Sequence, residues 1–348
     1  MIKKFYSRSA PFFVAEISAN HNGSLKHAKK LIKTAKNYGA DAVKLQTYTP
    51  DTMTIKSNRE EFKIKNGIWK GQTLWDLYDK AQTPFEWHKE LFSYAKKIKM
   101  TCFSTPFDET AVDLLEKLNC PIYKVASFEM NHIPLIKKIS KTKKPIIIST
   151  GMANLKEIEI AYDTARKNGA KDITLLYCVS NYPSKVSDFN LNNIKILKSK
   201  FNCRVGFSDH SNDNKVAMAA AFAGAEVFEK HIALSGQKNG YDINFSIKGS
   251  EIKKYKKDIC EAYAMLGKKY FYRNNSERKS HQFRRSIYAV KDIKKGDFFS
   301  FNNIKIIRPG NGLNPLYFEK LLKRKSPVNI KKSTPLKINL LKKLSLYK

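Results

Sequence analysis

Eight short runs of β-branched and aromatic residues recur along the chain, and most are followed by a helical pattern. The runs are continuously apolar more than alternating, which is typical of parallel strands covered on both faces. Eight strands alternating with helices predict an α/β fold of the (β/α)8 TIM-barrel type. A doubly wound sheet is the alternative, but the turn Ser18–Ser24 contains no G-x-G-x-x-G. The predicted strands are Phe12–Ser18, Asp41–Thr47, Thr101–Phe107, Pro121–Ser127, Pro145–Thr150, Ile173–Val179, Cys203–Asp209 and Val227–Ile232.

Start and stop signals predict helices between these strands. The segment Leu25–Tyr38 repeats apolar residues every three or four positions, and Gly39 follows it as a C-terminal cap. The tetrapeptide Thr83–Glu86 predicts an N-cap threonine, an N1 proline and a capping-box glutamate for a helix that ends at Lys97.

Two stretches fall outside this alternation. The interval Pro50–Lys80, which holds two of the three tryptophans, is an insertion on the side of the barrel where active sites form. Near the end of the chain the sequence pattern changes to short apolar runs separated by Gly and Pro turns. This pattern predicts a small β-rich domain. We therefore expect a barrel over residues 1–272, a polar and basic linker over 273–285 and the second domain over 286–348.

The charge balance leaves two interpretations open. The 65 Lys and Arg residues outnumber the 31 Asp and Glu residues, which gives a formal net charge of +34. Such an excess favours an acidic partner, and nucleic acid is one candidate. Only ten of the cations are arginine, however, and nucleic-acid readers rely on the planar guanidinium group. We therefore favour a solvated lysine-rich surface over a nucleic-acid-binding protein.

The cysteines and the apolar runs indicate the compartment. The five cysteines are widely spaced and form no C-x-x-C pair, which favours reduced thiols in a cytoplasmic protein. Glu16 interrupts the apolar patch near the N-terminus, so we expect no signal peptide. The longest apolar run, Val216–Ala225, is well short of the roughly 20 residues that cross a bilayer, so we expect no membrane association.

Polar residues concentrate where the predicted strands end. Because residues i and i+2 of a strand share one face, pairs such as Ser208 with His210 and Glu229 with His231 point to the same side. Lys44 forms a third pair of this kind with Gln46. A barrel interior is normally aliphatic, and an unpaired buried charge is costly, so these residues predict a functional site.

Two of these residues are candidate metal ligands. His210 and His231 end consecutive predicted strands, so their imidazoles can converge. Two histidines leave coordination positions open for water and substrate, which suits a divalent Lewis acid better than a closed structural zinc site. The alternative is that each is a core histidine whose partner is Asp209 or Glu229.

A second set of side chains offers positive charge and hydroxyl donors at the same end of the barrel. That combination is what phosphate or carboxylate recognition requires. The alternative is that the hydroxyl groups only cap loops, but two inward lysines argue against caps alone. The set comprises Lys44, Thr105, Lys124, Ser127, Ser180 and Ser208.

The motifs that carry these residues resemble the sialic acid synthases, a family of phosphoenolpyruvate-condensing enzymes. The resemblance extends in order over essentially the whole chain. It implies a catalytic barrel followed by an antifreeze-like (SAF) domain, which Ser286–Ala289, Asp292–Gly296 and Arg308–Gly310 match. The barrel motifs are Val14–Gly23, Val43–Thr47, Ser104–Phe107, Tyr123–Ser127, Ser149–Gly151, Tyr182–Pro183, Gly206–His210 and Glu229–His231.

The resemblance also implies a role for each residue. His210 and His231 would hold Mn²⁺ or Mg²⁺, and Glu16 and Glu129 would line the sugar site. Either carboxylate is also a candidate for moving protons, because it could stabilise the forming positive charge and deprotonate water. The lysine and hydroxyl set would bind phosphoenolpyruvate, although Ser180 replaces the asparagine that is usual in the neuraminate branch. Arg308 would reach the sugar bound in the partner subunit of a domain-swapped homodimer. The other residues expected around the sugar are Gln46, Tyr182, Glu229 and Asp242.

Details favour one branch of the family. Phe128 stands where many N-acetylneuraminate synthases carry glycine, and Leu77–His88 and Asp242–Ser246 resemble the branch that forms pseudaminic acid. The expected substrates are phosphoenolpyruvate and an open-chain, di-N-acetylated 6-deoxy-altrose. The nearest alternative is the same chemistry on N-acetylmannosamine or a legionaminic acid precursor.

Overall fold

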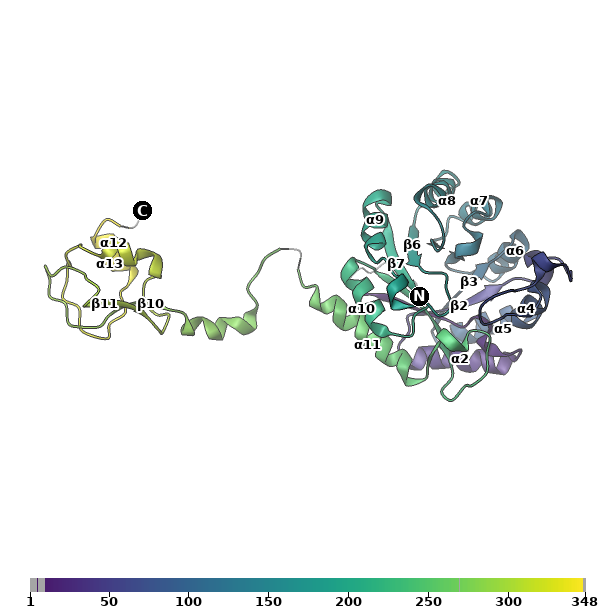
Figure 1. The fold of residues 1–348 in the computed structure, drawn as a ribbon, viewed down its shortest axis with the longest axis horizontal. Helices are drawn as coiled ribbons and strands as arrows, with labels where there is room; N and C mark the ends of the chain where they lie inside the picture. Colours follow the sequence, from purple (N-terminus) through teal and green to yellow (C-terminus); the bar gives the residue numbers. More distant parts are fainter. Residues whose placement is uncertain (1–4, 6–9, 269, 347–348) are drawn as a thin grey trace. The chain divides into compact units, whose positions relative to one another are not determined.

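A computed structural model describes residue 5, residues 10–268 and residues 270–346 of the chain. It divides the chain into two compact units, Met1–Gly267 and Lys268–Lys348 (Figure 1). Within the described residues, no helix is long and apolar enough to cross a membrane.

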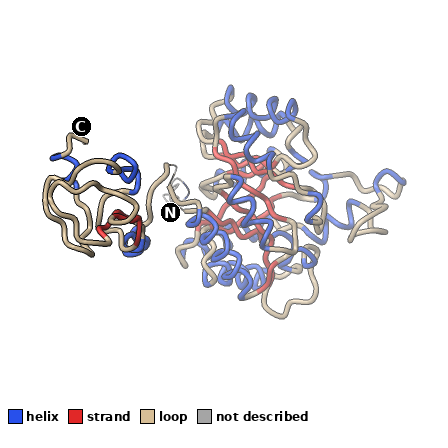
Figure 2. The backbone as a smooth tube through the Cα atoms, turned by 60° about the vertical axis from the view of Figure 1, so that its left-hand side comes forward, coloured by secondary structure: helices blue, strands red, loops and turns tan. Residues whose placement is uncertain are grey.

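The first unit is a closed barrel of parallel strands. Each strand pairs with the next in sequence, and β1 also pairs with β8, which closes the sheet on itself. Figure 2 shows the strands at the centre of this unit with helices around them. The eight predicted strands and the (β/α)8 barrel are thereby confirmed. The strands are β1 (Phe12–Glu16), β2 (Ala42–Thr47), β3 (Thr101–Pro106), β4 (Tyr123–Val125), β5 (Ile146–Ser149), β6 (Ile173–Cys178), β7 (Arg204–Asp209) and β8 (Val227–Ala233), with the short β9 (Ile247–Lys248) beside β8.

The helices of the barrel begin and end mostly where capping residues predict. Asn154 caps α8 (Leu155–Lys167), and Asp213 caps α10 (Asn214–Ala223), each through its side chain. Together they cover the apolar outer surface of the strands. The others are α2 (Leu25–Asn37), α5 (Phe85–Lys97), α6 (Glu109–Lys117), α7 (Ile133–Lys141), α9 (Asn192–Phe201) and α11 (Ser250–Met265).

One predicted cap is wrong. Helix α5 begins at Phe85, so its N-cap residue is Pro84, and no side chain caps its first turn. The Thr83 side chain is buried, and its hydroxyl lies 3.3 Å from Nε2 of His21. The local pattern predicts that the Thr83 hydroxyl group caps the helix, but this group makes a tertiary contact with His21 instead.

The register of the strands brings the polar residues to one level. Glu16 of β1 is opposite Lys44 on one side and His231 on the other. Ser208 of β7 is likewise opposite Glu229 of β8. Since all strands are parallel, these side chains meet at the carboxyl end of the barrel.

The insertion after β2 folds on itself. It consists of α3 (Pro50–Met53), the 3₁₀ helix η2 (Glu60–Phe62) and α4 (Leu74–Ala81). A hairpin joins η2 to α4, with hydrogen bonds from Ile64 N to Gln72 O and from Gly71 N to Ile64 O, each 2.9 Å long. Helix α4 lies at the edge of the barrel in Figure 1.

The second unit has its own small core around a two-stranded antiparallel sheet, β10 (Ser286–Ala289) with β11 (Ile304–Ile307). The segment before the sheet contains a 3₁₀ helix, η6 (Asn275–Phe283). The remaining elements are η7 (Pro315–Tyr317), α12 (Phe318–Leu321) and α13 (Ile338–Lys343).

Candidate active site

A cavity of about 440 Å³ opens at the carboxyl ends of the barrel strands. Thr105 lies behind its lining, where it contacts Lys44, and Arg308 lies exposed in the second unit. The other site residues predicted from the sequence all line the cavity: Glu16, Lys44, Gln46, Lys124, Ser127, Glu129, Ser180, Tyr182, Ser208, His210, Glu229, His231 and Asp242. We use the name charged floor for six of them that are buried at the strand ends: Glu16, Lys44, Lys124, His210, Glu229 and His231.

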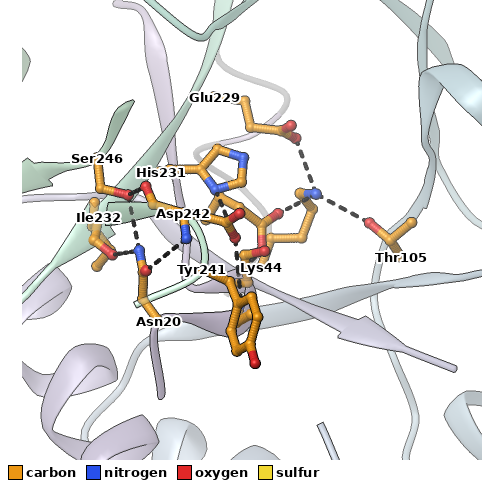
Figure 3. Close-up of polar contacts among 12 residues, drawn as sticks. Asn20, Lys44, Thr105, Glu229, His231, Ile232, Tyr241, Asp242 and Ser246 are labelled. Atoms are coloured by element: carbon orange, nitrogen blue, oxygen red, sulfur yellow. Dashed lines mark hydrogen bonds and ion pairs between the residues drawn. The ribbon is translucent and has the colours of Figure 1, made fainter. Parts of the chain in front are cut away.

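Lys44 lies at the centre of the charged floor. Its ammonium group forms an ion pair with Glu16, and it lies 3.5 Å from an oxygen of Glu229 (Figure 3). It also donates a hydrogen bond of 3.0 Å to Thr105 Oγ1. Burial alone would lower the pKa of Lys44, but the two carboxylates outweigh it and raise the pKa. Lys44 therefore stays charged although it is buried.

Lys124 lies in a different environment. Its Nζ donates to Ser149 Oγ at 2.6 Å and to the carbonyl oxygen of Val125 at 2.9 Å. Burial lowers the pKa of Lys124, and the charge of Lys44 adds to that effect, while Glu229 opposes it. An anion that entered the cavity would supply the countercharge that this ammonium group lacks.

Two serine hydroxyl groups reach the cavity because the backbone at Gly151 leaves room for them. Gly151 N donates to Ser127 Oγ at 3.1 Å. A β-carbon on Gly151 would lie 2.1 Å from Ser180 Oγ and 2.8 Å from Ser127 Oγ. Glycine at this position therefore allows both serines to reach the cavity.

The two histidines converge as their spacing predicts. Their ring centroids lie 5.7 Å apart. His210 Nδ1 lies 2.9 Å from the carbonyl oxygen of Val179, so it is the protonated nitrogen, and Nε2 keeps a free electron pair. Burial lowers the pKa of His210 to about 3, with a further contribution from His231, so the ring is neutral. His231 Nδ1 lies 3.6 Å from an oxygen of Asp242.

This donor set fits a divalent cation with open positions. Within the described residues, no cluster of three or more His, Cys, Asp or Glu side chains is arranged to hold a metal ion. Two converging imidazoles, one of them oriented through a hydrogen bond of its Nδ1 to a backbone carbonyl, are nevertheless an arrangement that protein ligands to such ions adopt. His210 and His231 are therefore the residues that could hold a metal.

The two candidate proton-handling carboxylates differ. Glu16 is fixed by its ion pair with Lys44 and by a 2.7 Å hydrogen bond from Ser18 N. Glu129 instead has a buried Oε2 that accepts no hydrogen bond from the described part of the chain. Burial raises the pKa of Glu129 to about 7, although the charge of Lys124 opposes the shift. Glu129 can therefore be protonated or ionised near neutral pH.

Sequence reasoning missed the residues that hold the cavity's sides in place. Asn20 donates to the carbonyl oxygen of Ile232 at 2.9 Å and to Ser246 Oγ at 2.8 Å, which fixes the loop that carries Asp242 (Figure 3). Trp69 of the insertion donates from Nε1 to the carbonyl oxygen of Tyr241 at 3.1 Å. The only sequence signal was the unusual length of the insertion. The further lining residues include Ser18, Tyr48, Met53, Ile64, Trp69, Leu74, Leu77, Tyr78, Ala81, Phe107, Phe128 and Tyr241.

Fold and site together define a barrel enzyme. Two buried lysines in its cavity can bind an anionic substrate. The chain belongs to the NeuB family, whose profile matches residues 31–270. This confirms the family that the sequence motifs indicate.

Individual relatives agree with that assignment. The chain is 41% identical over 97% of its length to a pseudaminic acid synthase of Campylobacter jejuni, of which 98% is covered. It is 42% identical over 94% of its length to a pseudaminic acid synthase of Helicobacter pylori, with 96% of that chain covered. An N,N'-diacetyllegionaminic acid synthase of Campylobacter jejuni is 38% identical over 91% of this chain and 96% of its own.

A solved structure has the same fold. The N-acetylneuraminic acid synthetase of Leptospira borgpetersenii superposes with a TM-score of 0.70 at 28% identity. The match covers 79% of this chain and 91% of that one.

Proposed function

We propose that this chain condenses phosphoenolpyruvate with an open-chain, di-N-acetylated 6-deoxy-altrose and water, and so forms pseudaminic acid and phosphate. Two pseudaminic acid synthases match nearly its full length. The structural observation that carries the proposal is the charged floor, where two buried lysines and two buried histidines line the same cavity.

Phosphoenolpyruvate binds at the lysines. Lys44 already balances Glu16 and Glu229, whereas Lys124 has hydrogen bonds but no ion pair among the described residues. Lys124 therefore gains most from a phosphate or carboxylate group. Ser127 and Ser180 line the same cavity and can donate to oxygens of the bound substrate.

His210 and His231 would hold a divalent ion, Mn²⁺ or Mg²⁺. When bound, this ion would supply a Lewis acid for the oxygen of the sugar aldehyde. The protein orients the His210 ring through Val179 O, and Asp242 lies beside His231.

Glu129 moves the protons. In its protonated form it donates to the aldehyde oxygen as the methylene carbon of phosphoenolpyruvate forms a bond to the aldehyde carbon. Positive charge then develops at the enol carbon, and the Glu129 carboxylate takes a proton from the water that adds there. At the resulting tetrahedral carbon the new hydroxyl group becomes the ketone C=O as the C–O bond to phosphate breaks, and the hydroxyl proton leaves with the phosphate. The residue thus returns to its starting protonation state.

The same residues support a nearest alternative, condensation with N-acetylmannosamine or a legionaminic acid precursor, because the floor does not distinguish these sugars. A nucleic-acid-binding role, motivated by the net charge of +34, is the remote alternative. The free thiols of the five cysteines support a cytoplasmic location for the enzyme.

Residues 286–348 of the second unit act as the antifreeze-like domain of this enzyme, and the chain works as a domain-swapped homodimer. Arg308, which is exposed on this unit, would complete the sugar site of the partner subunit. Mixing two inactive variants, His210→Ala and Arg308→Ala, should then restore activity, because one site in each mixed dimer has both residues. Mixtures that stay inactive while mixed dimers form would contradict an exchange of this residue.

The proposed chemistry is tested by phosphate release in ¹⁸O-labelled water. Phosphate should appear only when both phosphoenolpyruvate and the amino sugar are present, and it should contain no label, because water attacks carbon. Labelled phosphate would show attack at phosphorus and contradict the proposed steps.

A further inference from the structure

The insertion after β2 adds mostly apolar side chains to the cavity lining. Seven lining residues come from it, and five of them have side chains with no charge or hydrogen-bonding group, while Trp69 and Tyr78 each carry one polar group. We use the name apolar wall for this set: Met53, Ile64, Leu74, Leu77 and Ala81.

The apolar wall is held rigidly. Leu77 and Ala81 are the buried face of α4, and Ile64 lies in the hairpin that precedes this helix. Trp69 ties that hairpin to the loop carrying Asp242, through its hydrogen bond to Tyr241 O. Packing of α4 and the hydrogen bond of Trp69 hold these residues in place, so the wall can select a ligand by shape and polarity.

The chemistry at the floor fixes how the sugar must lie. Its aldehyde carbon must reach phosphoenolpyruvate at Lys44 and Lys124, so the other end of the open chain points away from the floor. Five C–C bonds separate C1 from C6, an extended reach of about 6 Å at roughly 1.3 Å a bond. This reach lets C6 contact lining residues beyond the strand ends, and the insertion contributes seven residues to that lining.

We propose that the apolar wall binds the C6 methyl group of the sugar and thereby selects 6-deoxy sugars over sugars with a 6-hydroxyl group. This inference rests on the proposed function and names a determinant of its substrate specificity. A 6-hydroxyl group against Leu77 or Met53 would lose its water without gaining a partner.

The expected discrimination is moderate. Apolar pockets reject a ligand that only adds a hydroxyl group by about 100-fold in kcat/KM. Isosteric amides in the wall would give that hydroxyl group a partner. The variants Leu77→Asn and Met53→Gln provide such amides at a buried and a half-buried position.

The experiment compares di-N-acetylated 6-deoxy-altrose with its 6-hydroxy counterpart, with phosphate release as the readout. The unsubstituted enzyme should prefer the deoxy sugar by about 100-fold, and either variant should reduce this ratio to about 10-fold. KM for phosphoenolpyruvate should not change. Ile68→Asn is the matched control, since this residue belongs to the same insertion but lies outside the cavity lining.

Met53→Gln keeps the test valid if Leu77→Asn does not fold. Equal turnover of both sugars by the unsubstituted enzyme overturns the inference and leaves the proposed function standing. A ratio that changes less than twofold in the folded variants also overturns it. Failure of both sugars to release phosphate overturns the proposed function itself, and the inference with it.

Discussion

The charged floor and the apolar wall line one cavity, yet different parts of the chain form them. The floor comes from strand ends, where the barrel register fixes each side chain against its neighbours, as for Glu16 between Lys44 and His231. The wall comes from an insertion that the barrel does not require. Under the two proposals above, the comparison ties the reaction to the barrel and the choice of sugar to the insertion.

The largest effect is expected at the histidine side of the floor. His210→Ala should reduce kcat by more than about 1,000-fold, because it removes one of the two groups that would hold the metal. The protein should stay folded by circular dichroism, and His281→Ala, an exposed position, should be neutral. Chelation should likewise abolish turnover of the unsubstituted enzyme, and activity that survives it would contradict the metal assignment.

A smaller loss is expected at the anion side of the floor. Lys124→Met should reduce kcat/KM for phosphoenolpyruvate by about 100-fold, the value of a charged hydrogen bond to the substrate. The fold should persist, since this lysine bonds only to Ser149 and a carbonyl oxygen among the described residues. Lys117→Met, on the exposed face of α6, is the control. An unchanged KM for phosphoenolpyruvate would show that Lys124 does not bind this substrate.

A substitution of Glu129 tests whether this carboxyl group transfers the protons of the reaction. With its pKa raised to about 7, the protonated acid prevails below that pH and is lost above it. We expect kcat/KM to fall as pH rises through about 7. Glu129→Gln should lower the rate at pH 6 by about 100-fold and remove this pH dependence. If the variant kept the same pH profile, another group would be responsible for the proton transfer.

The smallest effect is expected at the wall. Trp69→Phe keeps the ring but loses the hydrogen bond to Tyr241 O, which should raise KM for the sugar about threefold. KM for phosphoenolpyruvate should stay the same, because the floor is untouched. Trp75→Phe, outside the cavity lining, should change neither constant. Equal changes in both constants would show that floor and wall do not act separately.

The same difference decides what the sequence could predict. The floor was predictable because a two-residue period and parallel strands place Lys44, Glu229 and His231 at one end of a barrel. The wall was not, because its residues belong to short helices and a hairpin with no period that relates them to the strands. Thr83 failed for a similar reason, since a contact with His21 outweighed the local capping pattern.

Contacts between segments that are distant in sequence could not be predicted from the sequence. The bonds of Asn20 and Trp69 join segments far apart in sequence, and no local pattern signals such pairs. The pKa of Glu129 depends on burial beneath loops whose course the sequence does not specify. Both features follow from the packing of loops over a predictable frame.

The most direct test of the proposed function is phosphate release from phosphoenolpyruvate across a panel of sugars with Mn²⁺ present. The panel contains di-N-acetylated 6-deoxy-altrose, the legionaminic acid precursor and N-acetylmannosamine. We predict the fastest release with the first sugar and formation of pseudaminic acid as the product. Release with none of the three, or with N-acetylmannosamine alone, would contradict the proposal.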